Sequence, residues 1–484
     1  MNVIIDTERF HNVPNNESLV LILQRSDKWH LGVHAQRLDK KVKNYISQAL
    51  ASTKNNELII HLPQEESPQT IVVLGISGDD VSDLTNRGAD LFSLLSTTTC
   101  ANWTLINDTT FQSIEYQVLL GFDIKGAVNN KYKSNTIDPI LLTVYSEAHD
   151  QAEVERVSAL SRGISFAKQL ITTPPNDKFP VRYAEMVKAE LKEFDAKITV
   201  FDKGQLELLG MNCLLAVARG SAHDPIVLKI EINPDSTTRP TVLIGKGVIF
   251  DSGGLCVKPP ASMLDMKADM SGSAVVIGAI RALLEAKSSA RVIGLVGLVE
   301  NAIDGESYRP SDILRSHSKK TVEVIDTDAE GRLLLADLIS YAESELKPRS
   351  IVDIATLTGA IQIALGRNTA GLFSNNQELA QSLIMAGESA GEALHQFPIS
   401  QEFTDALLAR TSIADIAHLG KPGVGGQAIL AAAFLQYFVN KVPWAHLDIA
   451  GTSWNPENKL STNGGCTGYG VRLLYNYCQN QKTV

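Results

Sequence analysis

Acidic and basic side chains gather where apolar runs of this sequence end. Lys246 lies in an apolar run that leads into Asp251 and the turn Ser-Gly-Gly, and Asp269 follows in the segment Met-Lys-Ala-Asp-Met. Asp328 and Glu330 stand two residues apart, just before another apolar segment. Carboxylates that crowd together in apolar surroundings repel one another, and their oxygens are ligands for Mg²⁺, Mn²⁺ and Zn²⁺. The four acids would supply about enough oxygens to bridge two divalent metals, an arrangement typical of hydrolases.

The spacing of the last two acids predicts where they lie. Residues i and i+2 cannot share a helix face, but they share one face of an extended segment. We therefore expect a strand at residues 321–325 to deliver Asp328 and Glu330 at its end, at the edge of a parallel sheet where ligands bind. A lysine can join such metal ligands only as a neutral amine, and two nearby dications would lower its pKa.

Each of these residues also has a purely structural interpretation. Asp251 is suited to holding a turn, and Asp328 and Glu330 are suited to the start of the helix that follows them. The sequence holds no H-E-x-x-H and no G-x-x-x-x-G-K-[ST] motif, so a histidine-based or nucleotide-binding mechanism lacks a recognisable pattern. Three basic residues could be solvated surface charges: Lys246, Lys258 and Arg332.

The segments that must position these residues alternate between strand and helix patterns. Short Val/Ile/Leu-rich runs interleaved with helical runs predict an α/β fold with a mainly parallel central sheet. A helical pattern over residues 153–171 ends at Thr-Thr-Pro-Pro, where we expect two domains to be connected. One further helix is expected from Met263 to Ala286. The predicted organisation is a smaller N-terminal α/β domain at 1–150, a connecting helix and linker at 151–177, and a larger C-terminal domain at 178–484.

Composition narrows the class of protein. The 484 residues are 44% apolar and 20% charged, which excludes a disordered chain or a coiled-coil rod. A net charge of −10 argues against a nucleic-acid binder. The first residues are polar, no apolar run is long enough to span a bilayer, and the five cysteines form no C-x-x-C pair. We therefore expect a soluble cytoplasmic protein with no membrane contact.

The motifs resemble those of one known family. The segment Asp328-Ala-Glu-Gly-Arg-Leu closely resembles the N-T-D-A-E-G-R-L signature of the leucyl aminopeptidase family, the hexameric cytosolic metallo-aminopeptidases. The N-terminal 150 residues match only in length and general α/β character, and Asp326 stands where most members have Asn. The other matching segments follow the family's order and spacing across most of residues 170–484: Gly245-Lys-Gly, Phe250-Asp-Ser-Gly-Gly, Val257-Lys-Pro, Met266-Lys-x-Asp-Met, Arg309-Pro, Thr356-Leu-Thr-Gly-Ala and His446-Leu-Asp-Ile-Ala-Gly.

The resemblance implies a role for each residue of the acidic cluster. Two divalent metal ions, Mn²⁺ or Zn²⁺, would be bound in each subunit. Lys246 and Asp269 would bind the tighter ion, and Asp328 would bind the looser, exchangeable one. Asp251 and Glu330 would bridge the two ions.

The same resemblance implies residues that act on the substrate. Lys258 and Arg332 would be the catalytic pair, with Lys258 polarising the substrate carbonyl and Arg332 holding a bicarbonate as proton shuttle. The pocket for the first side chain of the peptide would be lined by Met266, Thr356 and Gly359, with Ala450 as a further wall.

Together these expectations describe an aminopeptidase reaction. A water bridging the two metals would attack the first peptide bond of a substrate whose free α-amine binds the exchangeable metal. The pocket residues are largely apolar, so we expect leucine-like side chains to be preferred within a broad specificity. The resemblance further implies a homohexamer that acts on peptides with a free N-terminus.

Two other functions stay open at the level of sequence. Some bacterial members of the family also bind DNA and act in gene regulation. For that role the sequence offers only the modest basic cluster of Arg37, Lys40, Lys41 and Lys43, and the net charge of −10 opposes it. The other function is that of a two-metal dipeptidase or amidase with a special substrate such as Cys-Gly, which only a substrate panel would distinguish.

Overall fold

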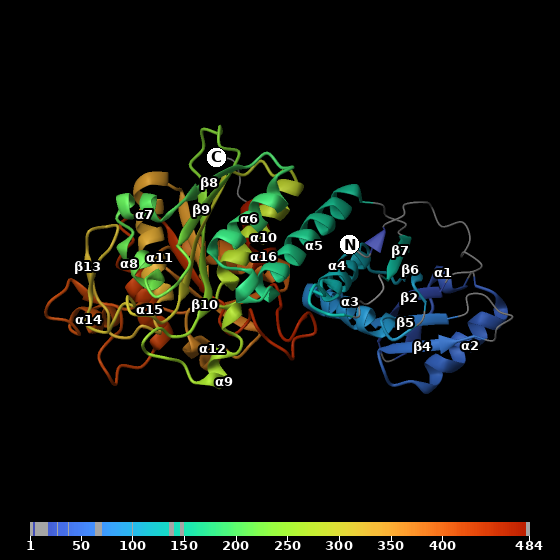
Figure 1. Ribbon diagram of the computed structural model, residues 1–484. Helices are drawn as coiled ribbons and strands as arrows, with labels where there is room; N and C mark the ends of the chain where they lie inside the picture. The colour runs from blue at the N-terminus through green and yellow to red at the C-terminus, as the bar shows by residue number, and fades with distance from the viewer. Residues whose placement is uncertain are drawn as a thin grey trace. The chain divides into compact units, whose positions relative to one another are not determined.

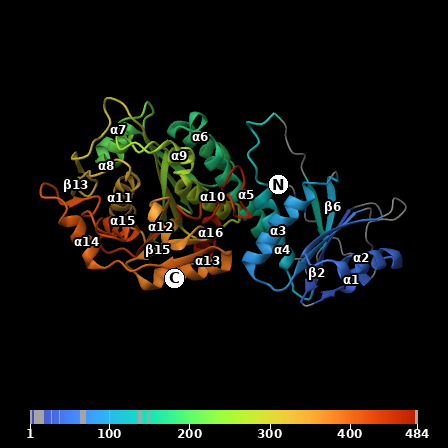
Figure 2. The same ribbon diagram turned by 90° about the horizontal axis from the view of Figure 1, so that it is seen from below.

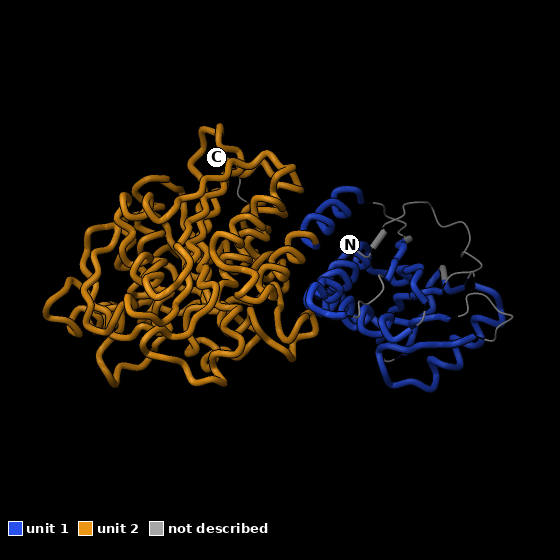
Figure 3. The backbone as a smooth tube through the Cα atoms, viewed as in Figure 1, with its two compact units in different colours: residues 1–161 blue, residues 162–484 orange. Residues whose placement is uncertain are grey.

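A computed structural model describes residues 3–4, 18–26, 28–36, 38–62, 70–98, 100–134, 140–145 and 150–480. The chain forms two compact units, residues 1–161 and 162–484, and the division falls inside helix α5 (Gln151–Thr172) (Figure 3). Arg37 of the basic cluster lies outside the described residues. None of the helices in the described ranges combines the length and the apolar composition needed to cross a bilayer.

The smaller unit is built on a seven-stranded sheet. Its strands are β1 (Val3–Ile4), β2 (Ser18–Arg25), β3 (Trp29–His30), β4 (Glu57–His61), β5 (Thr70–Ile76), β6 (Asn102–Asp108) and β7 (Leu141–Tyr145). Their order is β1-β7-β6-β2-β5-β4, with β3 paired to β2, and only β4–β5 and β2–β3 are antiparallel. Its helices are α1 (Val33–Gln36), α2 (Lys40–Ser52), α3 (Val81–Leu95) and α4 (Ile114–Gly126).

The central strand of this sheet contributes to both of its faces. Successive side chains of a strand point to opposite sides, so Leu19 and Leu21 of β2 pack in one core with Val42 and Ile46 of α2. Helices α3 and α4 cover the other face (Figure 1). The smaller unit is therefore a mainly parallel sheet covered by helices on both sides, as the interleaved pattern of the sequence predicts.

The larger unit holds an eight-stranded sheet. Its strands are β8 (Lys197–Phe201), β9 (Ile226–Ile232), β10 (Thr241–Asp251), β11 (Val292–Asn301), β14 (Ser350–Ala355), β15 (Thr369–Ser374), β16 (Ala393–Gln396) and β18 (Trp444–Asp448). Their order is β16-β15-β18-β14-β10-β11-β9-β8. The central strands β18, β14, β10 and β11 are parallel, so their carboxyl ends meet at one edge. The predicted α/β fold with a mainly parallel central sheet is confirmed.

Helices cover both faces of this larger sheet. They are α6 (Pro180–Leu191), α7 (Lys203–Leu209), α8 (Asn212–Ala218), α9 (Pro260–Met263), α10 (Ser271–Glu285), α11 (Gly331–Tyr341), α12 (Gly359–Leu365), α13 (Gln377–Ala390), α14 (Gln401–Leu408), α15 (Gln427–Gln436) and α16 (Val471–Gln479). In both views, α6, α10 and α16 lie on one side of the sheet, and α8, α11 and α15 lie on the other (Figure 1 and Figure 2). Strands β10, β11 and β14 are buried almost throughout, which explains their continuous apolar runs.

The helix expected from Met263 to Ala286 is wrong in its first third, before Ser271. The chain instead forms α9, a 3-10 turn at Met266–Ala268, and then α10. Asp269 lies between the turn and α10, where its Oδ1 is 2.7 Å from Lys246 Nζ. A continuous helix would not leave Asp269 free for this contact, so a tertiary ion pair overrides the local helical pattern.

The strand expected at residues 321–325 is also placed differently. It ends earlier, as β13 (Thr321–Glu323), and pairs with β12 (Ile313–Arg315) and β17 (Ile416–Ala417) in a separate three-stranded sheet. Asp328 and Glu330 therefore lie on the loop between β13 and α11, and not at the end of a strand of the central sheet.

Candidate active site

The acids and lysines predicted to form a cluster do come together at the carboxyl edge of the parallel strands. Lys246 and Asp251 lie on β10, whose last residue is Asp251. Asp269 follows the 3-10 turn before α10, and Asp328 and Glu330 lie on the loop that leads into α11. Segments far apart in the chain thus contribute to one site, as ligand sites in open α/β sheets do.

Two irregularities of the backbone bring these side chains within reach of one another. Strand β10 carries one residue more than β11 between Val248 and Asp251, and such a bulge bends a strand and redirects its side chains. At the start of α11, a Cβ on Gly331 would lie 2.6 Å from Lys246 Cε. Only a glycine at position 331 leaves room for Lys246 to reach Glu330, the residue before Gly331.

Lys246 is the counterion of two of the acids. Its Nζ lies 2.7 Å from Asp269 Oδ1 and 2.9 Å from Glu330 Oε1, and it donates to the backbone carbonyl of Thr356 over 2.8 Å. Burial alone would lower the pKa of Lys246, but the charges of Asp269, Glu330 and Asp251 raise it above its ordinary value. While Lys246 is paired with these carboxylates, its side chain is therefore a charged ammonium.

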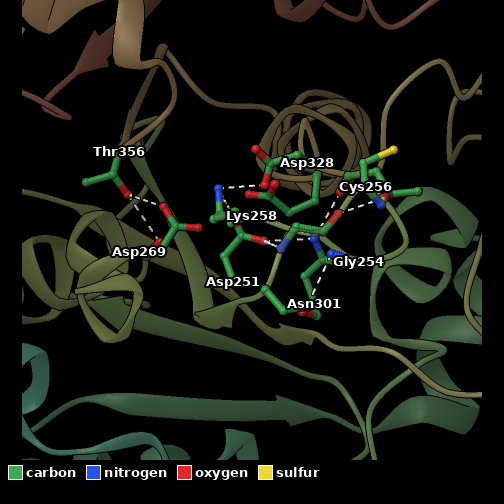
Figure 4. Close-up of polar contacts among 12 residues, drawn as sticks. Asp251, Gly254, Cys256, Lys258, Asp269, Asn301, Asp328 and Thr356 are labelled. Carbon is green, nitrogen blue, oxygen red and sulfur yellow. Dashed lines mark hydrogen bonds and ion pairs between the residues drawn. The ribbon is translucent and has the colours of Figure 1, made fainter. Parts of the chain in front are cut away.

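Lys258 holds the other two acids. Its Nζ lies 2.8 Å from Asp251 Oδ2 and 2.6 Å from Asp328 Oδ1, and Figure 4 shows it between the two carboxylates. Asp251 Oδ1 also accepts from the N–H of Gly253 over 2.9 Å and from Asn301 Nδ2 over 2.8 Å. Burial alone would lower the pKa of Lys258, but the contacts with the two carboxylates raise it above its ordinary value.

The carboxylates remain crowded in spite of the two lysines. Burial and the charge of Glu330 raise the pKa of Asp251 to about 6, and burial raises the pKa of Asp269 and of Asp328. Carboxylate oxygens of Asp251, Asp328 and Glu330 all lie within 4.8 Å of one another. Asp269 Oδ2 is buried and has no hydrogen-bond partner in the described part of the chain. Clustered carboxylates with an unpartnered buried oxygen fit the ligand preferences of divalent cations.

The residues predicted to line a substrate pocket lie beside this cluster or at neighbouring strand ends. Thr356 Oγ1 donates to Asp269 Oδ1 over 2.8 Å, so Thr356 touches the cluster directly (Figure 4). Met266 opens the 3-10 turn that leads to Asp269. Gly359 begins α12, where an added Cβ would meet no atom within 4 Å, and Ala450 follows the end of β18. For all four residues, contact with a substrate stays a prediction.

Sequence reasoning missed Asp448, which ties two of these strand ends together. Its Oδ1 accepts from the N–H of Leu357 over 3.1 Å and of Ala450 over 3.2 Å, and its Oδ2 accepts from Thr358 Oγ1 over 2.7 Å. The side chain is fully buried at the end of β18. An acid at the end of an apolar strand, inside a motif that matches the family, is the signal that points to it.

Sequence reasoning also missed a pair, Asn301 and Thr327, which fixes the turn that follows Asp251. Asn301 Nδ2 donates to the carbonyl of Thr327 over 2.9 Å. It also donates to Asp251 Oδ1, and Figure 4 shows these two side chains side by side. Thr327 Oγ1 donates to the carbonyl of Gly253 over 2.6 Å and accepts from the N–H of Cys256 over 2.8 Å. The turn after β10 is thus joined to the loop that carries the last two acids of the cluster.

His418 is the fourth missed residue, and it shapes the loop between β13 and α11. The N–H of Ile325 donates to its Nδ1 over 3.0 Å, and its Nε2 lies 2.8 Å from the carbonyl of Asp326. A neutral ring with its proton on Nε2 satisfies both contacts. Burial and the charge of Arg332 lower the pKa of His418 to about 4, so the ring is neutral near pH 7. The carbonyl of His418 accepts from Arg332 Nη1 over 2.8 Å.

Asp326, the residue that departs from the family pattern, belongs to this loop and not to the cluster of acids. Its Oδ1 accepts from the N–H of Asp328 over 2.9 Å. An asparagine side chain offers the same oxygen, so this contact does not depend on the extra charge. The substitution therefore leaves the support of Asp328 intact.

Replacing His418 with leucine should lower kcat by about tenfold or more, with KM changed by less than about threefold, because the loop loses the two ring contacts that hold Ile325 and Asp326. His418→Gln should recover part of the loss, since its amide offers one acceptor and one donor. Steady-state kinetics and thermal unfolding of both variants measure this. His317→Leu is the control, since that ring bonds Ser340 Oγ over 2.9 Å and does not touch the loop. Equal kinetic losses in the two leucine variants would contradict a positioning role.

Carboxylates and lysines at the carboxyl edge of a parallel sheet, arranged to hold divalent cations, define a metal-dependent enzyme of the α/β class.

The family described as "Cytosol aminopeptidase family, catalytic domain" matches residues 165–475. Three bacterial proteins named "Probable cytosol aminopeptidase" are similar over most of their length. The one from Wolbachia pipientis is 39% identical over 85% of this chain and 83% of its own. The one from Methylorubrum populi is 43% identical over 73% and 72%, and the one from Ehrlichia ruminantium is 38% identical over 86% and 85%.

The chain belongs to the cytosol aminopeptidase family, as the resemblance of its motifs predicts. It is accordingly a metallo-aminopeptidase, a hydrolase that acts on peptides and uses divalent metal ions. The residues described above as the cluster lie inside the matched segment.

Proposed function

We propose that the chain releases the N-terminal residue from peptides, with leucine-like residues preferred within a broad specificity. The observation that carries the proposal is the convergence of four carboxylates on two lysines at one edge of the sheet. The preference for leucine-like residues rests on the small or apolar positions Met266, Gly359 and Ala450. One methylene discriminates only weakly in such a pocket, so several first residues would be accepted.

The proposed metal ligands are the five residues that the resemblance implies. Lys246, as a neutral amine, and Asp269 would hold one ion, Asp328 would hold the other, and Asp251 and Glu330 would lie between the two. The unpartnered oxygen of Asp269 and the closeness of the other three carboxylates support this set. Bound Mn²⁺ or Zn²⁺ would supply Lewis acidity and activate a water molecule at neutral pH.

Two basic residues would act on the substrate. Lys258, a charged ammonium at the cluster, would donate to the carbonyl oxygen of the scissile bond, where negative charge develops. Arg332 would hold a bicarbonate ion, which supplies the chemistry of a general base. Its Nε is buried without a hydrogen-bond partner among the described residues, which suits an anion there. Burial lowers the pKa of Arg332 to about 10, so the side chain stays charged near pH 7.

We further propose that the chain works as a homohexamer in the cytoplasm. The hexamer rests on the family resemblance alone, and the name "cytosol aminopeptidase" that the relatives carry supports the cytoplasm. The alternatives gain no support. Of the basic cluster considered for DNA, the described Lys40, Lys41 and Lys43 all lie at the start of α2, and Lys43 Nζ is engaged by the carbonyl of Gln36 over 2.9 Å. Neither a dipeptidase nor an amidase with a special substrate is favoured by any feature of the site.

Acetylating the substrate amine should slow hydrolysis at least about a hundredfold, because an amide nitrogen is neither a metal ligand nor a charged group for the carboxylates. Release of leucine from Leu-Gly-Gly and from N-acetyl-Leu-Gly-Gly, measured at equal concentration, tests this. Comparable rates on the two peptides would show that the free N-terminus is not what the site recognises, and the aminopeptidase proposal would fail.

A further inference from the structure

A second polar cavity lies at the opposite edge of the large sheet from the active site. Its volume is about 930 Å³, and it is lined by the amino ends of β10, β11 and β14, by one face of α13, and by the C-terminal part of α16. Just before each of the three strands stands an arginine that lines the cavity: Arg239, Arg291 and Arg349. Because the acidic cluster lies at the carboxyl ends of these parallel strands, the length of the strands separates the two sites.

Two of the three arginines are held in place without being neutralised. Arg291 Nη1 donates to the carbonyl of Ser236 and, over 2.6 Å, to that of Thr238. Arg239 Nη2 donates to the carbonyl of Pro348 over 2.7 Å. A carbonyl accepts a hydrogen bond but carries no net charge, so these contacts orient the guanidinium groups and leave their charges in place.

The side chain of the third arginine, Arg349, has neither a carbonyl partner nor an acidic partner in the described part of the chain. Arg349 is exposed, and its side chain forms no hydrogen bond or ion pair there, whereas its backbone N–H donates to the carbonyl of Pro240. Arg239 and Arg291 likewise form no ion pair with a described residue. Elsewhere in this unit the fold does pair such charges, as with Arg281, which contacts both Glu190 and Glu285. Three unneutralised guanidinium charges on one concave wall raise the local positive potential, although the chain as a whole carries −10.

The rest of the wall adds hydrogen-bonding groups and one acid. Thr238, Ser289 and Ser382, whose side chains carry hydroxyl groups, are among the lining residues. Glu378 is the one carboxylate among the lining residues, and it forms no ion pair with a described residue, so the wall keeps an excess of two positive charges. The volume falls within the range of small-molecule sites and exceeds what a lone phosphate ion would fill.

We propose that this cavity binds a small molecule through a phosphate group. Guanidinium groups match phosphate oxygens in paired, charge-assisted hydrogen bonds, and two of them are already oriented by the backbone. The concave shape favours a small ligand over a nucleic-acid duplex. The site would bind this ligand independently of the peptide substrate, since no residue of the acidic cluster lines the cavity.

Titration calorimetry with inorganic phosphate on the full, metal-loaded chain tests the proposal. The informative variant is Arg349→Gln, because the Arg349 side chain makes no hydrogen bond with a described residue and the substitution keeps the backbone N–H that bonds Pro240. It should weaken phosphate binding about tenfold or more, while peptide hydrolysis stays unchanged. Arg182→Gln is the matched control, since Arg182 is exposed on the same unit and paired with Glu185 at 2.9 Å. Phosphate bound by the catalytic metals would persist in Arg349→Gln and so be recognised.

Several outcomes would overturn the proposal. Equal phosphate affinity in the wild type and in Arg349→Gln would show that the cavity does not take part. Phosphate binding that appears only after residues 481–484 are deleted would mean that the chain's own C-terminus occupies the cavity. Binding of a short DNA duplex through Arg349, with no binding of phosphate, would replace the small ligand by a nucleic acid.

Discussion

Chelation of the metal ions should reduce hydrolysis of leucine p-nitroanilide by at least about a thousandfold, and added Mn²⁺ or Zn²⁺ should restore it. The reaction needs a water that is activated near pH 7, and a bound divalent cation lowers the pKa of water by several units. The clustered oxygens of Asp251, Asp328 and Glu330 and the unpartnered oxygen of Asp269 are the groups that would hold such ions. Activity is measured after long dialysis against a strong chelator and again after metal is returned.

Full turnover in the chelated protein would contradict the hypothesis that the site depends on metal ions. The control is the thermal unfolding of the dialysed protein, because loss of activity through loss of the fold would not be reversed so simply. Metal content measured alongside activity relates the two quantities directly, with two ions per chain expected at full activity from the resemblance.

The two lysines of the cluster should behave differently when each is replaced by alanine. Lys258→Ala should retain both metal ions yet lose about two to three orders of magnitude in kcat, the usual effect of removing one contact to a developing negative charge. Lys246→Ala should instead bind metal more weakly, and excess metal should recover part of its activity. The reason is position, since Lys246 is enclosed between Asp269 and Glu330, whereas Lys258 reaches the cluster from a loop with its side chain 14% exposed.

Metal titration and steady-state kinetics on the two variants decide between the roles. Lys267→Ala is the matched control, because Lys267 lies close by in the chain but its ion-pair partner is Asp265, at 3.4 Å, outside the cluster. It should leave both metal affinity and kcat near their wild-type values. If Lys258→Ala loses metal and Lys246→Ala does not, the two roles are the reverse of those proposed.

Three of the four acids of the site could be predicted because each lies where a local pattern changes. Asp251 ends a long apolar run, and Asp328 and Glu330 precede an apolar helix, so the printed sequence marks them. The α/β fold was predictable for the same reason, since the central strands are buried on both faces and show continuous apolar runs.

The supporting residues could not be predicted, because they act across long stretches of chain. His418 bonds Ile325 and Asp326, which precede it by more than ninety residues, and nothing in its local sequence shows this. The expectation of a continuous helix from Met263 was wrong for a related reason, because Asp269 forms an ion pair with Lys246, which lies on another element. Strand β13 was misplaced because a three-residue strand of a separate small sheet has no pattern that distinguishes it from a strand of the central sheet.

The two lysines in the cluster have a consequence for how the enzyme exists between periods of activity. Lys246 and Lys258 contact all four carboxylates, so half of the negative charge is offset before any metal arrives. We therefore expect the metal-free chain to keep its fold, with a thermal midpoint only a few degrees below that of the loaded protein. Such a metal-free chain is inactive but remains folded. A cell could then raise or lower peptide turnover through its supply of ions, without making or degrading a single copy of the enzyme.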